Sequence, residues 1–325
     1  MRQLCNILNI QYPLIQGGMG NISHPALVAA VSEAGGLGTI GCGTRSPEEV
    51  AKLIEETRTR TARPFAVNIA LNMKQDVPAL IDLVIRARIP VVSLSAGNPA
   101  SYMARLKAAG IKVMCVVATV RHALRAEASG ADVLVAEGFE AAGINSPKEL
   151  TTFTLIPQIA SRVNIPVVAA GGIADGRGLA AALSLGASGV QMGTRLIATK
   201  EAPYHDRYKQ RIIEAGDEET IVIGRHFGQV RRVLKGTYSE NIHRLESTLS
   251  IEEYVEMTSE VAHVKGTLEG DEQRGFMNSG QVAGLISEMP SVSVLFTTMM
   301  NEAIAQMSEA KAVLTEMCDQ KRHPQ

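Results

Sequence analysis

Residues 137–152 (EGFEAAGINSPKELTT) combine the residue types from which an α/β protein commonly builds an active site. Glu137 ends an apolar run, glycine follows, and a short loop of small residues leads to a helical stretch. At its centre the loop carries Ile144 and Asn145, with no histidine, cysteine or lysine. Isoleucine cannot transfer a proton, and asparagine can form hydrogen bonds without titrating. The loop therefore predicts a binding site that supplies no general base of its own.

Two glycine-rich loops near residues 171 and 193 suit an anion. VPVVAA is followed by GGIADGRG, and GVQM is followed by GTR, each before a helical segment. Gly171 and Gly172 in the first loop, and Gly193 with Thr194 in the second, would bring backbone N–H groups at helix starts toward one anion. Glycines that only make tight turns are the alternative, but two such loops on adjacent final strands favour a phosphate.

Strand 1 ends in QGGMG, where Gly17 and Gly18 permit close approach of a ligand to the backbone and Met19 offers a soft side chain. Asn68 is a polar residue inside the apolar run FAVNIAL. A buried amide needs hydrogen-bond partners. Asn68 therefore either ties strands together or contacts a cofactor, and the sequence leaves both alternatives open.

Eight short apolar runs, each followed by a helical pattern, must position these residues. This alternation predicts a parallel (β/α)8 TIM barrel, whose active site lies at the carboxyl ends of the strands. The runs are apolar throughout, as parallel strands buried on both faces should be. They cover residues 14–16, 37–40, 65–71, 91–95, 112–118, 133–137, 167–170 and 189–192.

After the eighth run the pattern changes. Residues 201–275 are richer in charge and show no clear strand–helix alternation, which predicts a smaller, mainly helical insertion. A final helix over residues 291–320 would return to the barrel. The predicted domains are thus a barrel of residues 1–200 and 276–325, and an insertion or substrate lid of residues 201–275.

GGLGTIG contains the spacing of a dinucleotide-binding fingerprint. That fingerprint follows a strand and opens a helix. Here a helical stretch, PALVAAVSEAG, comes first, and a strand-like LGTI contains the second glycine and ends just before the third. These glycines are better interpreted as a helix-to-strand turn with close strand packing.

Composition excludes several classes of protein. The 325 residues carry a net charge of -1 with scattered basic residues, so neither nucleic acid nor a membrane surface is an expected partner. Cys5, Cys42, Cys115 and Cys318 lie far apart, which argues against a metal site or disulfide framework and for a reducing, cytoplasmic compartment. Cys42 follows strand 2, where a small apolar role is favoured because no base is identifiable beside it.

Several motifs resemble those of the nitronate monooxygenase / 2-nitropropane dioxygenase-like barrels. That family includes FabK-type enoyl-ACP reductases and NAD(P)H:quinone reductases. The resemblance spans about residues 4–287, and RHFGQVRRV in the insertion is similar to FabK. It implies a flavoprotein oxidoreductase. The motifs are QGGMG, AGGLGTIG, FAVNIAL, EGFEAAG, PVVAAGGIADGRG, GVQMGTR and SGQVAGLI.

The resemblance implies FMN as the bound cofactor, with NAD(P)H as electron donor left open and a homodimer expected. The insertion would lean over the barrel mouth and shape the substrate pocket. The implied cofactor-binding residues are Gly17, Gly18, Met19 and Asn68 toward the flavin ring, Glu137 and Gly143 at the ribityl chain, Gly171, Gly172, Gln191, Met192, Gly193 and Thr194 at the phosphate, and Gln281 near the flavin edge.

The chain departs from the family at one position. The family motif places a histidine after the glycine and assigns it the acid–base or substrate-polarising role, and this chain has Ile144 there. Asn145 and His122 are weak candidates to replace it. His24 and His226 are further candidates, but a surface or packing role is favoured for each histidine.

The missing base separates the candidate reactions. An alkyl nitronate is already an anion, so its oxidation with O2 demands no base, whereas deprotonating a neutral nitroalkane does. Nitronate oxidation is therefore the leading hypothesis. The alternatives are an NAD(P)H-dependent reductase of an enoyl thioester or quinone, and a flavin-binding module whose catalysis has lapsed.

Overall fold

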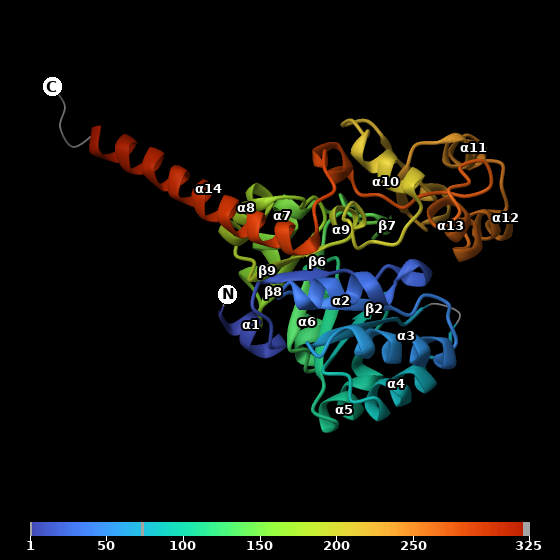
Figure 1. Ribbon diagram of the computed structural model, residues 1–325, viewed down its shortest axis with the longest axis horizontal. Helices are drawn as coiled ribbons and strands as arrows, with labels where there is room; N and C mark the ends of the chain where they lie inside the picture. Colours follow the sequence, from blue (N-terminus) through green and yellow to red (C-terminus); the bar gives the residue numbers. More distant parts are fainter. Residues whose placement is uncertain (1, 73–74, 321–325) are drawn as a thin grey trace.

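A closed barrel of eight parallel strands forms the body of the protein (Figure 1). The computed structural model describes residues 2–72 and 75–320. The amide of Gln16 donates to the carbonyl of Leu37, and the amide of Leu37 donates to the carbonyl of Leu14, which closes the barrel. In chain order the strands are β1 (Leu14–Gln16), β2 (Gly38–Gly41), β3 (Phe65–Ala70), β4 (Val91–Ser95), β5 (Lys112–Val117), β6 (Val133–Glu137), β8 (Val167–Ala170) and β9 (Gly189–Met192).

The predicted TIM barrel is confirmed, and each predicted strand agrees with the structure to within one residue. Helices alternate with the strands and surround them. Side-chain caps define several of their starts, including a capping box between Ser46 and Glu49. The helices are α2 (Pro25–Glu33), α3 (Pro47–Arg60), α4 (Val77–Arg86), α5 (Ala100–Ala108), α6 (Val120–Ala128), α7 (Thr152–Ala160), α8 (Gly176–Ser184) and α9 (Thr194–Ile197).

A helix that the sequence pattern did not predict, α1 (Arg2–Leu8), precedes the first strand. Leu4 and Leu8 are fully buried and belong to the cluster that fills the barrel interior with Ile15, Val133 and Val168. A Cβ at Gly189 would come within 2.7 Å of Leu4 Cδ2. The helix therefore packs against the start of β9 and covers the amino-terminal end of the barrel, opposite the active-site end.

The region after β9 is mainly helical, as predicted, and it also contains a β-hairpin that was not predicted. Strands β10 (Thr220–Ile223) and β11 (Arg231–Leu234) pair antiparallel, and β11 also pairs with β7 (Gly143–Ile144), which comes from the loop after β6. The pairing partner lies about 90 residues away in sequence, so no local pattern indicates it. The helices here are α10 (Asp206–Ile213), α11 (Thr237–Leu245), α12 (Ile251–Met257) and α13 (Glu260–Thr267), with short 3-10 turns η2 (Arg225–Phe227) and η3 (Gln281–Leu285).

The last helix, α14 (Val292–Gln320), confirms the predicted return to the barrel. Its first half packs on α8, where Gly176 donates to Glu302 Oε2 over 2.9 Å, and its second half projects from the body (Figure 1). Residues 321–325 of the predicted barrel portion lie outside the described residues, and the division into two domains stays a prediction. Within residues 2–72 and 75–320, no helix has the length and apolar character needed to cross a membrane.

Candidate flavin site at the barrel mouth

The loop after β1 lies directly against β2 and β3. A Cβ at Gly18 would come within 2.6 Å of Asn68 Cβ, and a Cβ at Gly41 would come within 2.8 Å of the Met19 amide nitrogen. Real Cβ atoms do not approach that closely, so only glycine permits this packing. Gly17 donates to the carbonyl of Met192 over 2.9 Å, which joins the same loop to the end of β9.

Asn68 is held by its neighbours on β4. Its Nδ2 donates to Ser93 Oγ and Ser95 Oγ, each over 3.2 Å, and contacts the Ser93 carbonyl at 3.3 Å. All three contacts use the amide nitrogen, so the strand-tying role left open by the sequence is present. The side-chain oxygen faces Gly18, with 2.7 Å between Oδ1 and the position of an added Cβ. Asn68 can therefore tie strands together and still present an acceptor at the mouth.

Arg45 fixes the loop after β1, a role that the sequence pattern did not indicate. Its guanidinium donates to the carbonyls of Gly20 at 2.9 Å, Ser23 at 3.3 Å and Gly41 at 3.2 Å, and also to Asn21. Burial lowers the Arg45 pKa, although the neighbouring carbonyls keep the charged form satisfied. No motif could reveal this role, because a backbone clamp depends on where the loop lies and not on residue spacing.

The residues predicted at the phosphate and Gly17, predicted at the flavin ring, come together at the ends of three adjacent strands. The barrel order places β9 between β1 and β8, so Gly17, Gly193 and Gly171 follow neighbouring strands. Gly171 and Gly172 adopt φ of 98° and 76°, the left-handed region that favours glycine. A Cβ at Gly193 would meet no protein atom within 4 Å, which leaves open space in front of its backbone.

The start of α8 is not part of this anion site, which corrects the prediction that both loops offer the start of a helix. Asp175 caps the helix by accepting from Gly178 over 2.9 Å, and Glu302 accepts from Gly176 over 2.9 Å. These carboxylates occupy the free amides and would repel an anion. The available N–H groups are those of the preceding glycines. The sequence around α8 could not indicate this, because Glu302 comes from α14 and reaches Gly176 only in the tertiary structure.

Thr194 and the segment before η3 meet at the same place. Thr194 is buried, and its hydroxyl oxygen accepts from Gly280 over 2.9 Å, so the hydroxyl hydrogen can still be donated to a phosphate. Gln281 is the residue predicted at the flavin edge. Its backbone N–H donates to the carbonyl of Glu140 over 3.0 Å, and the residue is exposed. The Met192 side chain is buried in the core, so only its backbone is available to a cofactor. The side-chain nitrogen of Gln191 lies 3.4 Å from the position of a Cβ added at Gly17.

Glu137 ends β6 and lines a narrow pocket with Ala118, Phe139 and Asn145. Burial raises the pKa of Glu137 to about 7. Asn145 is buried in the pocket wall, and its Nδ2 donates to the carbonyls of Ala141 at 2.9 Å and Gly143 at 3.1 Å. Asn145 therefore holds the loop closed, whereas Glu137 is a carboxyl group able to hold a proton near neutral pH.

Ile144, where the resemblance leads us to expect a histidine, lies on β7 directly opposite Arg231 of β11. Its side chain is 53% exposed, a high value for isoleucine, whereas Arg231 is 7% exposed. Residues opposite each other in an antiparallel pair lie on the same face of the sheet. An apolar side chain is thus presented beside a buried guanidinium, and nothing at this position can exchange a proton.

The other candidate bases do not join the site. His122 is exposed on α6, where partial burial and the neighbouring arginines lower its pKa. His24 caps α2 by accepting from Ala26 over 3.1 Å, and His226 lies against Phe227 in η2. Cys42 is fully buried, and burial raises its pKa to about 12, which confirms an inert thiol. The packing roles favoured for these residues are consistent with the structure.

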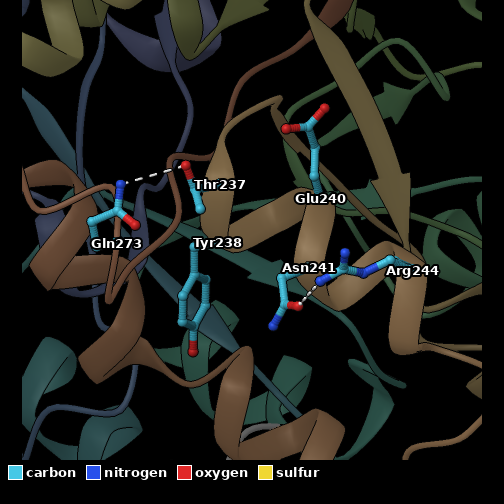
Figure 2. Close-up of a pocket in the computed structure, with 6 residues that line it drawn as sticks. All are labelled: Thr237, Tyr238, Glu240, Asn241, Arg244 and Gln273. Carbon is cyan, nitrogen blue, oxygen red and sulfur yellow. Dashed lines mark hydrogen bonds between the residues drawn. The ribbon is translucent and has the colours of Figure 1, made fainter.

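Taken together, these residues fit a flavin mononucleotide. Close-packed glycines, an acceptor on Asn68 and open space at Gly193 lie at the same mouth of the barrel, where they could serve a ring and a phosphate. The pocket in Figure 2 is separate. It has a volume of about 390 Å³, and its polar atoms bond one another, Arg244 to Asn241 and Gln273 to Thr237. No predicted cofactor residue lines it.

Comparisons with known proteins agree with this geometry. The nitronate monooxygenase family pattern matches residues 2–80 and 73–302. FabK from Thermotoga maritima is 40% identical, with a TM-score of 0.92 over 96% of this chain and 98% of that one. A probable nitronate monooxygenase of Staphylococcus aureus is 31% identical over 94% of this chain and 97% of its own length. A 5-hydroxy-7a-methyl-1-oxo-octahydro-1H-indene-4-carboxyl-CoA dehydrogenase of Rhodococcus jostii is 32% identical over 95% and 98%.

The chain therefore belongs to the nitronate monooxygenase family. It is an oxidoreductase of a family of flavin enzymes that also contains FabK-type members.

Filling the space in front of Gly193 should abolish cofactor binding without unfolding the protein. Gly193→Asp places a carboxylate where the phosphate is expected, and the φ of -117° lies outside the left-handed region that favours glycine. We expect the variant to purify colourless with unchanged melting temperature. Gly216→Asp is the matched control, because a Cβ there also meets open space. A yellow Gly193→Asp protein would place the phosphate elsewhere.

Glu137 should make the flavin-free protein less stable as pH rises. Its folded pKa, about 7, lies above the ordinary 4.5, so the folded state binds the proton more tightly than the unfolded state. The free energy of unfolding should then fall between pH 4.5 and 7, by up to about 3 kcal/mol at 1.36 kcal/mol per pKa unit. Denaturant unfolding at pH 5 and pH 8 measures this. Glu137→Gln should lose the dependence, and an equal slope in both proteins would contradict the prediction.

Proposed function

We propose that the protein is an FMN-dependent oxidoreductase that oxidises alkyl nitronates with O2 as the electron acceptor. Ile144 is the observation that carries this proposal, because it stands exposed where the family has its histidine. A reaction that begins with an anion needs no proton removed, and a nitronate is such a substrate. Four free cysteines fit a reducing, cytoplasmic compartment.

In this proposal the flavin would accept electrons from the substrate and pass them to O2. The chain itself binds and orients. Gly17, Gly18 and Asn68 would hold the ring, and the amides of Gly171, Gly172 and Gly193 with Thr194 would hold the phosphate. Glu137 would meet the ribityl chain with Gly143 beside it, and its raised pKa lets its carboxyl group donate a hydrogen bond near neutral pH. Ile144 would present an apolar wall to the substrate's alkyl group.

A second candidate is the NAD(P)H-dependent reduction of an enoyl thioester or a quinone. The observation that favours it is the 40% identity to FabK, higher than the 31% identity to the probable nitronate monooxygenase. Reducing an enoyl thioester also needs a proton delivered to carbon, which Ile144 cannot supply. Solvent or Glu137 would have to supply it. A flavin-binding module without catalysis is the third candidate, since intact binding residues without a base fit that role as well.

Anaerobic reduction of the bound FMN discriminates these candidates. We expect ethyl nitronate to bleach the visible flavin absorption, and NADH and NADPH to leave it unchanged. Stopped-flow absorbance at the flavin band measures both. Rapid bleaching by either nucleotide would instead favour the reductase. Retention of FMN with no bleaching by any of these reagents would favour the non-catalytic module.

Restoring the family histidine should add a base. Ile144→His should raise the rate with neutral nitroethane at least about tenfold at pH 8, below the roughly 10²–10⁴-fold of a well-positioned general base, and change the rate with ethyl nitronate less than about threefold. Ile144→Gln is the control, because it is polar and does not titrate. The rate of O2 consumption measures both variants. Equal gains in the histidine and glutamine variants would show that polarity, and not proton transfer, is responsible.

A further inference from the structure

Four polar side chains, those of Arg231, Asn278, His263 and Glu260, form a polar chain that starts on β11, the strand paired with β7. Arg231 Nη1 donates to Asn278 Oδ1 over 3.3 Å, and Asn278 Nδ2 lies 3.1 Å from His263 Nε2. His263 Nδ1 faces Glu260 Oε2 at 3.6 Å, and Glu260 Oε2 accepts from the amide of Asn21 over 3.3 Å. His263 is 3% exposed and Arg231 is 7% exposed, whereas Asn278 and Glu260 are partly buried.

The contacts determine which nitrogen of His263 carries the proton. Arg231 can only donate, so it requires the oxygen of the Asn278 amide on its side. The nitrogen of that amide then donates to His263 Nε2, which must accept. The proton of the neutral ring is therefore on Nδ1, directed at the Glu260 carboxylate. Within the described residues Nδ1 has no hydrogen-bond partner, and this carboxylate oxygen is 3.6 Å away.

The polar chain connects two parts of the candidate site, the loop after β1 and the strand pair β7–β11. At one end, Glu260 contacts the loop after β1, where a Cβ at Gly20 would lie 3.3 Å from its Oε2. At the other end, Asn278 bridges to Val233 of β11 and lies 3.5 Å from an added Gly143 Cβ. Phe276 supports the centre, stacked on His263 with 5.3 Å between ring centroids and carrying Arg231 over its face at 5.0 Å.

We propose that His263 is a positioning residue that couples the loop of residues 17–21 to the loop of residues 141–147. This deepens the proposed function, because it rests on these two loops flanking the flavin and the substrate. His263 is too deeply buried to touch either ligand. It acts by hydrogen-bonding Asn278 through Nε2 and by packing Nδ1 against the Glu260 carboxylate, so that the insertion and the barrel mouth keep one relative arrangement.

Two variants separate the two halves of the coupling. His263→Asn keeps a donor at the Nδ1 position and loses the Nε2 acceptor, whereas His263→Gln keeps an acceptor near Nε2 and loses the Nδ1 donor. In flavin-free protein, hydrogen–deuterium exchange should rise at least fivefold over residues 141–147 in the Asn variant and over residues 17–23 in the Gln variant. Tyr254→Phe is the control, because it removes the partly buried hydrogen bond from Tyr254 to the carbonyl of Gln229 in the same core and breaks no hydrogen bond of the polar chain.

A second readout addresses function. With FMN added to saturation, both His263 variants should lose at least fivefold in kcat on the wild-type enzyme's substrate, while Tyr254→Phe should lose less than twofold. Equal exchange in the two His263 variants, or exchange like that of Tyr254→Phe, would overturn the proposal. Segment-specific exchange without any change in kcat or in the flavin spectrum would also overturn it. If the wild-type protein binds no FMN, the proposed function fails, and the exchange pattern still decides whether the coupling exists.

Discussion

The close approach of the loop after β1 to β2 and β3 is the constraint on which the barrel mouth depends. Gly18 lies against Asn68, and Gly41 lies against the amides of Met19 and Gly20, at distances that leave no room for a Cβ. Arg45 fixes the loop from outside by donating to three of its carbonyls and to the carbonyl of Gly41 on β2. Because a buried carbonyl must be satisfied, this single guanidinium keeps an irregular loop in one conformation.

The insertion forms a second wall of the barrel mouth by pairing with the loop after β6. Strand β7 is only two residues long, yet it pairs with β11 and becomes the edge of a three-stranded sheet. Arg232 extends the same attachment by donating to the carbonyl of Phe139 over 3.1 Å and lying over the Phe139 ring. The loop after β6 is therefore shared between barrel and insertion. The residue at position 144 is thus held by contacts with both units.

The candidate flavin site and the proposed loss of a histidine place different demands on a fixed fold. The residues assigned to the cofactor lie at the ends of five strands, and several of them would act through backbone groups that glycine exposes. Proton transfer, in contrast, depends on one side chain. One substitution can therefore alter the range of substrates while the fold and the flavin site persist. The similarity of this chain to both a FabK and a probable nitronate monooxygenase is consistent with that separation.

The sequence by itself determined the barrel, its eight strands and the residues that meet at its mouth. Buried parallel strands are apolar runs between amphipathic helices, and glycines mark the turns, so both signals are local. Tertiary structure alone decided the rest. The partners of β7, the clamp by Arg45, the carboxylate of Glu302 at the start of α8 and the chain from Arg231 to Glu260 all join residues far apart in sequence. Such contacts arise from how elements pack, which no periodicity or motif encodes.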